Sequence, residues 1–230
     1  QISMSGRQAE AADQCLRTVA DLGQQLVALG GSGKVVKIYG TADGKLRHKL
    51  TKHTDWITAL AFSPDGKKLA SSDRAGGIHL WDPAGGGILL SLSEHKASVR
   101  ALAWRSDSKM LASGGEDGLL IWWDAKDGWP AITKTNAHPP ARPQGTYGKI
   151  PNGVLSLAFG PGGQLLTAGR DSQVRLWNSR GDAERAFSFE NALPIQTSIT
   201  FDGKGYLPEV RTVSFVVCWE TWINLVDGSA

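Results

Sequence analysis

A unit of about 42 residues recurs along the 230-residue chain and constrains its fold more than any other feature. The best-preserved copy, residues 95–124, ends in Trp122-Trp123-Asp124. Leu80-Trp81-Asp82 stands 42 residues earlier, and Tyr39 stands 42 residues before Trp81. A fixed period of this size is typical of proteins built from stacked modules, none of which buries its apolar face alone. The sequence therefore predicts an array of similar modules.

Each module is expected to be a small antiparallel sheet. In the best-preserved copy, residues 99–104 and 110–113 alternate or run apolar, and residues 119–123 are apolar and β-prone. Turn-forming residues separate these stretches at 105–108 and 116–118. With a fourth strand at 131–135, the unit makes a four-stranded meander, which is the form of a propeller blade.

The polar positions of this unit resemble the motif of the WD-repeat family of β-propellers. That motif has a His before the first strand, Ser or Thr ending the second, Asp in the next turn, and Trp-Asp closing the third. Here these positions hold His95, Ser113, Asp117 and Trp123-Asp124. The resemblance covers roughly residues 15–227 and implies an all-β WD-repeat propeller with about five four-stranded antiparallel blades visible.

The same template divides the chain into an N-terminal segment, residues 1–14, and a propeller, residues 15–230. The blades are expected at approximately 15–50, 53–92, 95–135, 138–190 and 191–230. Because the last blade ends before a fourth strand, residues 2–4 or their neighbours are expected to supply the closing strand. Two arrangements stay open, a closed five-bladed propeller and part of a seven-bladed one, since seven is the usual number in the family.

The resemblance implies that the motif residues form a structural network, in which the histidine bridges Asp to Ser or Thr and the hydroxyl meets the Trp indole. These residue types also occur in nucleophilic triads, but the repetition favours the structural role. The expected sets are His95, Ser113, Asp117 and Trp123; His138, Thr167, Asp171 and Trp177; and His53, Ser71 and Trp81. Ala75 stands where the third set needs Asp, so His53 is expected to lack its acceptor.

No residue is assigned to catalysis, cofactor binding or metal binding. The glycine-rich stretch 30–34 lacks the first glycine and the Ser or Thr of a phosphate loop, and no helix is expected after it. The five histidines fall in different blades or on different strands. We therefore expect no cofactor and no metal ion.

The loops that precede the first strand and follow the second strand of each blade are the expected contact surface. Proteins that resemble this chain generally bind partners across that face, and Trp and Arg dominate interaction hot spots. An insertion of 12 residues before the fourth blade adds further candidates. The predicted partner-binding residues are Trp56, Arg74, Glu116, Arg142, Tyr147, Arg170 and Trp219.

Composition narrows the classes of partner. The chain has 25 Lys and Arg against 22 Asp and Glu, without a basic run, so nucleic acid is not the expected partner. No stretch approaches the roughly 20 apolar residues that span a bilayer, so no membrane insertion is expected. The chain is expected to be soluble, in the cytoplasm or the periplasm. Cys15 and Cys218 map to the same face of the first and last blades, and a disulfide between them stays open.

The leading hypothesis is a non-catalytic scaffold that binds a partner protein or another domain of its own polypeptide. The alternative is an enzyme or small-ligand binder that uses the central channel of the propeller. Against it, the inward positions of two first strands hold Ala59, Ala61, Ala101 and Ala103, which offer no acid, base or nucleophile. The amino-acid sequences of the turns resemble those of bacterial WD-repeat proteins, which are often modules of larger chains.

Overall fold

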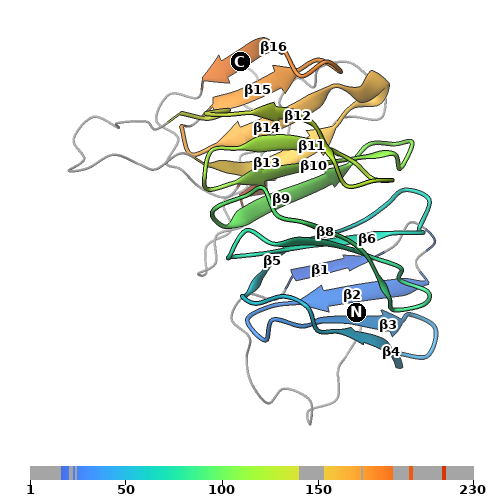
Figure 1. The fold of residues 1–230 in the computed structure, drawn as a ribbon. Helices are drawn as coiled ribbons and strands as arrows, with labels where there is room; N and C mark the ends of the chain where they lie inside the picture. The colour runs from blue at the N-terminus through green and yellow to red at the C-terminus, as the bar shows by residue number, and fades with distance from the viewer. Residues whose placement is uncertain are drawn as a thin grey trace, which may run out of the picture.

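The protein is an all-β array of small antiparallel sheets. The computed structural model describes residues 17–20, 23, 25–139, 153–171, 173–188, 197–198 and 214–215. These residues form four sheets of four strands and one pair of short strands, and every sheet is built from strands that are consecutive in the chain. Figure 1 shows the sheets succeeding one another from β1–β4 in blue to β13–β16 in orange.

The strands occupy the following residues. The first sheet contains β1 (Arg17–Ala20), β2 (Leu26–Gly30), β3 (Val36–Gly40) and β4 (Leu46–Leu50). The second contains β5 (Ile57–Phe62), β6 (Leu69–Asp73), β7 (Ile78–Trp81) and β8 (Ile88–Leu92). The third contains β9 (Val99–Trp104), β10 (Met110–Gly115), β11 (Leu120–Asp124) and β12 (Pro130–Lys134). The fourth contains β13 (Val154–Phe159), β14 (Leu165–Gly169), β15 (Gln173–Trp177) and β16 (Ala183–Ser188), with a short 3₁₀ turn at Pro161–Gly163.

The apolar core lies between neighbouring sheets rather than inside any one of them. One buried cluster joins Ile78 and Leu80 of the second sheet to Leu111, Ile121 and Trp123 of the third. A second cluster joins the third sheet to the fourth, and a third joins the first to the second. Each sheet therefore needs its neighbour to cover its apolar face, which is the physical reason for the repeat.

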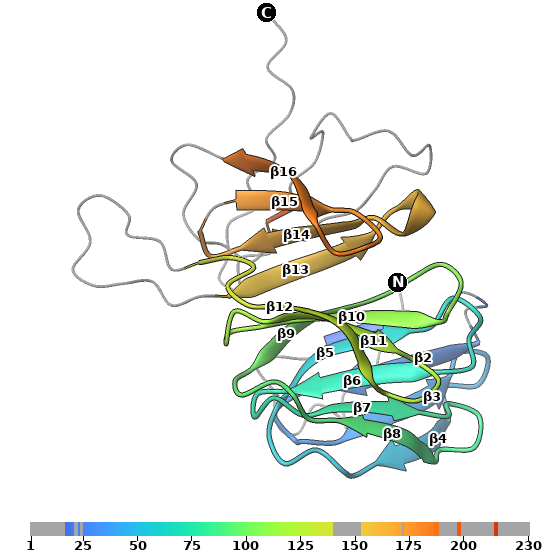
Figure 2. The ribbon, with the colours of Figure 1, turned by 45° about the horizontal axis from the view of Figure 1, so that its top comes forward.

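The position of a strand in its sheet decides its burial pattern. Every residue of β6 and β7 is buried, because these middle strands are covered by neighbouring sheets on both faces. The outer strands β4, β8 and β12 expose most of their residues. The first strands of successive sheets, β5, β9 and β13, contact one another and form the inner side of the array. The sheets thus have the inner-to-outer order of propeller blades (Figures 1 and 2), and the predicted fold class is confirmed.

The same irregularity recurs in all four sheets. The pairing of the third and fourth strands shifts register between Ile38 and Tyr39, and it shifts at the same point of the other three sheets, before Trp81, Trp123 and Trp177. A β-bulge bends its strand and turns the local side chain. The position that carries the motif tryptophan is therefore marked in the backbone as well as in the sequence.

The predicted fifth blade is described only in part. The strands β17 (Thr197–Ser198) and β18 (Ser214–Phe215) pair antiparallel and lie within residues 191–230, where this blade is expected. The expected closing strand at residues 2–4, Cys15 and Cys218 lie outside the described residues. The blade boundaries, the number of blades and the disulfide therefore stay predictions. No helix among the described residues is long and apolar enough to cross a bilayer.

Candidate functional site: buried polar networks and a hollow on the loop face

The third blade contains a buried chain of hydrogen bonds that links its loops to its strands. Trp123 Nε1 donates to Ser113 Oγ at 2.8 Å. Ser113 Oγ lies 2.8 Å from His95 Nε2, and His95 Nδ1 lies 3.0 Å from Asp117 Oδ2. Because the carboxylate only accepts, Nδ1 carries the hydrogen, and in the neutral ring Nε2 accepts from the serine. The hydroxyl of Ser113 is buried and hydrogen-bonded to both His95 and Trp123, so its role is structural.

The fourth blade contains the same arrangement. His138 Nδ1 lies 2.7 Å from Asp171 Oδ1, and His138 Nε2 lies 2.7 Å from Thr167 Oγ1. Trp177 Nε1 donates to the same hydroxyl at 2.9 Å. His138 is fully buried beside the fourth sheet, although an insertion separates it from β13 in the sequence.

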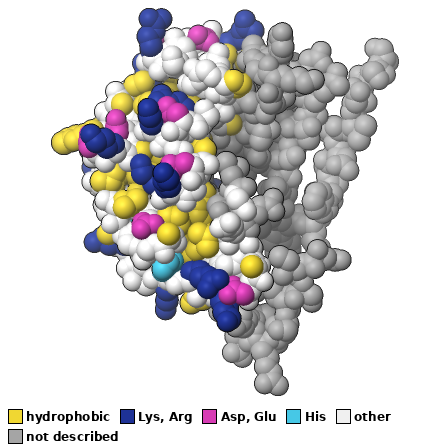
Figure 3. Space-filling model, turned by 90° about the vertical axis from the view of Figure 1, so that its right-hand side faces the viewer, with side chains coloured by type: hydrophobic (Ala, Val, Ile, Leu, Met, Phe, Trp, Pro, Cys, Tyr) yellow, Lys and Arg dark blue, Asp and Glu magenta, His cyan; other side chains and the backbone are white. Residues whose placement is uncertain are grey.

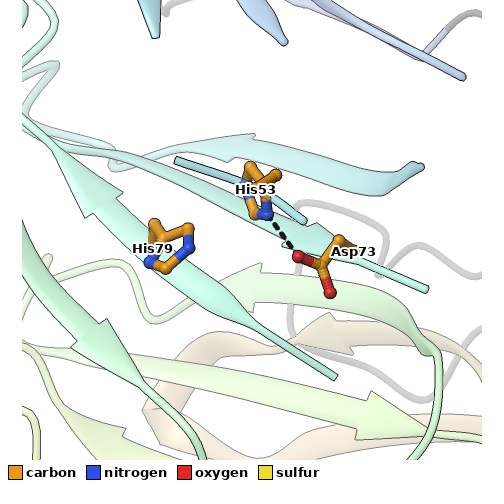
Figure 4. A group of neighbouring side chains, drawn as sticks. All are labelled: His53, Asp73 and His79. Carbon is orange, nitrogen blue, oxygen red and sulfur yellow. Dashed lines mark hydrogen bonds and ion pairs between the residues drawn. The ribbon is translucent and has the colours of Figure 1, made fainter. Parts of the chain in front are cut away.

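The second blade also contains the network, with a different carboxylate. The expectation that His53 lacks an acceptor is wrong, because Asp73 Oδ2 lies 2.7 Å from His53 Nδ1 (Figure 4). His53 Nε2 lies 2.6 Å from Ser71 Oγ, to which Trp81 Nε1 donates at 2.7 Å. Asp73 Oδ1 also accepts from the amides of Ala75 and Gly77, at 3.0 and 2.8 Å.

Strand register explains how Asp73 replaces the expected acceptor. Asp73 pairs with Ile57 as Gly115 pairs with Val99, so the two residues occupy the same position of their blades. A Cβ atom at Gly115 would lie 2.5 Å from Asp117 Oδ1 and 2.6 Å from His95 Nδ1. A carboxylate can therefore approach the histidine from the strand end or from the turn, but not from both. The second blade holds Asp and Ala at these two positions where the third holds Gly and Asp.

The carboxylates of the networks in the second and third blades are stabilised in their charged form. Burial raises the pKa of Asp73, but hydrogen bonds from His53 and from the amides of Gly77 and Ala75 outweigh it and hold that pKa below its usual value. Burial opposes the hydrogen bonds in the same way at Asp117, where His95, Lys96 and Leu119 are the donors and the pKa is again lowered. Both carboxylates are consequently charged near neutral pH.

A second histidine lies against the network of the second blade. His79 is nearly buried, its ring centre is 4.5 Å from that of His53, and its Nδ1 lies 3.0 Å from Ser91 Oγ (Figure 4). Burial first, and the nearby His53 second, lower the pKa of His79 to about 4. Its position in β7 corresponds to Ile121 in β11.

The atoms of His53, Asp73 and His79 that could ligate a metal ion lie within 4.8 Å of one another. Both ring nitrogens of His53 are already bonded, one to Ser71 and one to Asp73. Binding an ion would require His53 to give up one of these bonds. The geometry therefore favours a structural tie over a metal centre at this group.

We expect that replacing Ser113 by alanine destabilises the protein. The change leaves Trp123 Nε1 and His95 Nε2 without their shared partner in a buried site. The free energy of unfolding should fall by about 2 kcal/mol, as measured by urea denaturation. Ser106→Ala, in an exposed turn of the same blade, should change it by less than about 0.5 kcal/mol. Equal effects of the two changes would contradict the role of Ser113.

In the second, third and fourth blades, the loop after the second strand is linked to the segment before the first strand by the same backbone hydrogen bond. The amide of Arg74 donates to Trp56 O at 2.9 Å, that of Glu116 to Ser98 O at 2.8 Å, and that of Arg170 to Gly153 O at 3.0 Å. Four of the predicted partner-binding residues, Trp56, Arg74, Glu116 and Arg170, therefore lie at the same edge of their sheets. Arg142, Tyr147 and Trp219 lie outside the described residues.

A hollow of about 260 Å³ opens where the loops of the second and third blades meet. We call it the Trp56 pocket, and its lining residues are Trp56, Ile57, Thr58, Arg74, Ser98, Arg100 and Glu116. The Trp56 side chain is 45 % exposed, and the Arg74 guanidinium lies 5.3 Å from the centre of its ring. Glu116 forms ion pairs with Arg100, at 3.5 Å, and with Arg170. The blades thus bring three of the predicted residues into one cavity, with the fourth beside it.

Arg100 belongs to the Trp56 pocket and was not among the predicted residues. It is the second residue of β9, at the position that Thr58 holds in β5. The sequence does contain a signal for Arg100, because it is the one charged residue in an otherwise apolar first strand. The family template places contacts in loops, and Arg100 lies in a strand, so the template does not include it.

Charge is distributed evenly over the surface that Figure 3 shows. On this face, Lys and Arg side chains lie close to Asp and Glu side chains, with hydrophobic side chains between them. The described part of this face has no broad area of one sign.

Comparison with known proteins agrees with this geometry. The sequence model of the WD domain, G-beta repeat, matches residues 44–82, 86–124 and 142–178, which together make up half of the chain. A segment of 52 residues is 40% identical to nuclear distribution protein PAC1 of Mycosarcoma maydis and covers 23% of this chain and 12% of that protein.

Two further relatives match over short segments. A segment of 60 residues is 38% identical to the 66 kDa stress protein of Physarum polycephalum, and covers 25% of this chain and 10% of that protein. A segment of 68 residues is 34% identical to small ribosomal subunit protein RACK1y of Oryza sativa subsp. japonica, and covers 30% of this chain and 20% of that protein. The matches thus span a fifth or less of each relative's length. With its repeated blades and their His, Ser or Thr, Asp and Trp networks, the chain belongs to the WD-repeat family of β-propellers.

Proposed function

We propose that this chain is a non-catalytic scaffold that binds a partner protein, or another domain of its own polypeptide, through the loop face of the propeller. The observation that supports it most is the convergence of Trp56, Arg74, Glu116 and Arg170 at one edge of neighbouring blades around the Trp56 pocket. Aromatic and arginine side chains that flank a pocket are typical of interaction hot spots. A bacterial origin and a place in a larger polypeptide stay predictions.

The alternative use of the central channel by an enzyme has less support. The first strands β5 and β9 carry Ala59, Ala61, Ala101 and Ala103, whose side chains supply no proton transfer and no nucleophile. Binding through the loop face needs only the residues that the blades already present there. Turnover in a hydrolase and lyase screen, abolished by substitutions in β5 or β9, would favour the channel instead.

The scaffold proposal is tested by affinity capture with the intact protein and with Trp56→Ala and Arg170→Ala. Each change should reduce the recovery of the captured partner by about tenfold, because truncating a hot-spot residue typically costs about 1 to 2 kcal/mol or more. Trp129→Ala is the matched control. Trp129 is 74 % exposed in the turn between β11 and β12, which lies at the opposite edge of the sheet from Glu116. A partner lost equally with Trp129→Ala would contradict binding through the loop face.

A further inference from the structure

The charges around the Trp56 pocket do not cancel. Arg74 and Arg100 line it and Arg170 lies beside it, whereas Glu116 is the single carboxylate in the lining. Glu116 forms ion pairs with Arg100 and Arg170. Arg74 lies over the ring of Trp56 and forms no ion pair with a carboxylate among the described residues. The side chain of Asp55, next in sequence to Trp56, accepts a hydrogen bond from the backbone amide of Trp56. The pocket therefore has an excess of positive charge on one side of an indole.

The pocket also contains an unused hydrogen-bonding group. Ser98 is 5 % exposed, and its Oγ is one of two buried side-chain polar atoms without a hydrogen-bond partner among the described residues. A buried hydroxyl without a partner costs about 1 to 3 kcal/mol. Ser98 lines the pocket, and a rotation about one side-chain bond redirects its hydroxyl. A ligand that accepts a hydrogen bond there would recover this cost.

The seam between the second and third blades differs from its neighbours in being joined by polar side chains. A Cβ atom at Gly30 or Gly114 would lie 2.7 Å from Ile57 Cγ2 or 2.5 Å from Val154 Cγ1, so those seams are closed by glycine. At the corresponding position of the second blade, Ser72 Oγ donates to Val99 O at 3.1 Å. Thr58 Oγ1 donates to the same carbonyl at 2.5 Å. Hydrogen bonds from Ser72 and Thr58 thus link the second blade to the third beside the pocket.

We propose that the Trp56 pocket binds the carboxylate of an Asp or Glu side chain from an extended acidic segment of the partner protein, a proposal that rests on the loop face being the binding face. The carboxylate accepts from the guanidinium groups of Arg74 and Arg100 and from the hydroxyl of Ser98. The methylene groups of the ligand side chain pack against the exposed indole of Trp56. Arginine suits this role because its planar donors match a carboxylate.

The test uses the full chain and three dye-labelled peptides of identical length, with a central run of Glu, Gln or phosphoserine in a Gly-Ser background. Binding is followed by fluorescence anisotropy at two salt concentrations. The Glu peptide should bind at least about tenfold more tightly than the Gln peptide, as expected for two charge-assisted hydrogen bonds. Equal affinity for Glu and Gln peptides, or tighter binding of phosphoserine than of Glu, would overturn the carboxylate assignment.

Four variants assign the binding to this pocket. Arg74→Gln and Arg100→Gln should each weaken the Glu peptide about tenfold, and Ser98→Ala about threefold. Glu116→Gln should act in the opposite direction and strengthen it about threefold, because it removes the carboxylate that competes with the ligand for Arg100 and Arg170. Unfolding midpoints measured for every variant separate loss of binding from loss of folding. An unchanged or weaker affinity in Glu116→Gln would overturn the proposed geometry.

The matched control is Arg47→Gln. Arg47 lies on the outer strand β4 and pairs with Asp43 at 2.9 Å, away from the pocket lining. Its loss should leave the affinity for the Glu peptide unchanged, and an effect equal to that of Arg74→Gln would show non-specific attraction. If the peptides are not discriminated while Trp56→Ala still abolishes partner capture, the carboxylate proposal fails and the scaffold proposal stands. If the Glu peptide binds as expected but partner capture is insensitive to Trp56→Ala, the pocket binds a carboxylate, but partner binding through the loop face is contradicted.

Discussion

Replacing Asp73 by glycine is expected to lower the free energy of unfolding by about 3 to 4 kcal/mol. Asp73 accepts hydrogen bonds from His53 Nδ1 and from the amides of Ala75 and Gly77. The His53 and Asp73 side chains are buried, so the change leaves His53 without its acceptor inside the protein. Each hydrogen bond to a charged group typically contributes about 1.5 to 3 kcal/mol, so losing those from His53 and from the two amides accounts for a loss of this size. Urea denaturation followed by tryptophan fluorescence measures this loss.

The stronger part of this prediction is a rescue. Adding Ala75→Asp to Asp73→Gly recreates the Gly and Asp arrangement of the third blade and should restore most of the lost stability. Ala75→Asp alone should destabilise the protein by about 1 to 2 kcal/mol, because two carboxylates would then approach one histidine. The two changes should therefore show a favourable coupling energy in a double-mutant cycle.

Asp65→Gly provides the matched control for the cycle. Asp65 lies in an exposed turn of the same blade and accepts from Ser63 Oγ at 2.6 Å. Its loss should cost about 1 kcal/mol, and Ala75→Asp should not restore it. A double variant of Asp73→Gly and Ala75→Asp that stays as unstable as Asp73→Gly would show that the two carboxylate positions are not interchangeable.

The second large effect is a pH dependence that belongs to His79. Its pKa is about 4 in the folded protein against the ordinary histidine value of 6.5, so between these values the unfolded chain binds the proton and the folded chain does not. Protonation consequently favours unfolding as the pH falls. The free energy of unfolding keeps its full value above pH 6.5 and falls progressively down to pH 4, by about 2 to 3 kcal/mol. The lowered pKa values of Asp73 and Asp117 act below this window, where their own stabilisation is lost.

Replacing His79 by isoleucine should remove this loss between pH 6.5 and 4. Isoleucine is the residue that the third blade holds at the corresponding position, where Ile121 is fully buried. Denaturation of the variant and of the original protein at several pH values measures the difference. Ser91→Ala removes the hydrogen-bond partner of His79 but keeps the ring, so its pH dependence should persist. The titration of His79 would not be the cause if His79→Ile kept the original slope.

Local pattern was sufficient to predict the strands. The stretch 99–104 was expected as the first strand of the best-preserved unit and has these bounds in the structure. Alternation and turn residues act over a few neighbouring positions, so one sequence contains the information. The residues expected to form the networks of the third and fourth blades are brought together, although 18 positions separate His95 from Ser113 and 29 separate His138 from Thr167.

The error at His53 has a physical reason. The template asks for a carboxylate at one place in the turn, whereas the histidine requires only an acceptor near Nδ1. The end of β6 brings Asp73 to that place from a different backbone position. The signal in the sequence is an acidic residue displaced by two positions from the place where the template expects it.

The sequence by itself determined the repeating strands, their turns and the residue types that tie each blade together, because these depend on hydrogen bonding and burial within one module. Only the tertiary structure decided which carboxylate reaches His53 and that Trp56 and Arg74 of one blade share a pocket with Ser98, Arg100 and Glu116 of the next. The physical reason is that these contacts cross from strand to loop and from blade to blade. Their distances follow from how modules pack, and packing depends on the side chains of both neighbours at once.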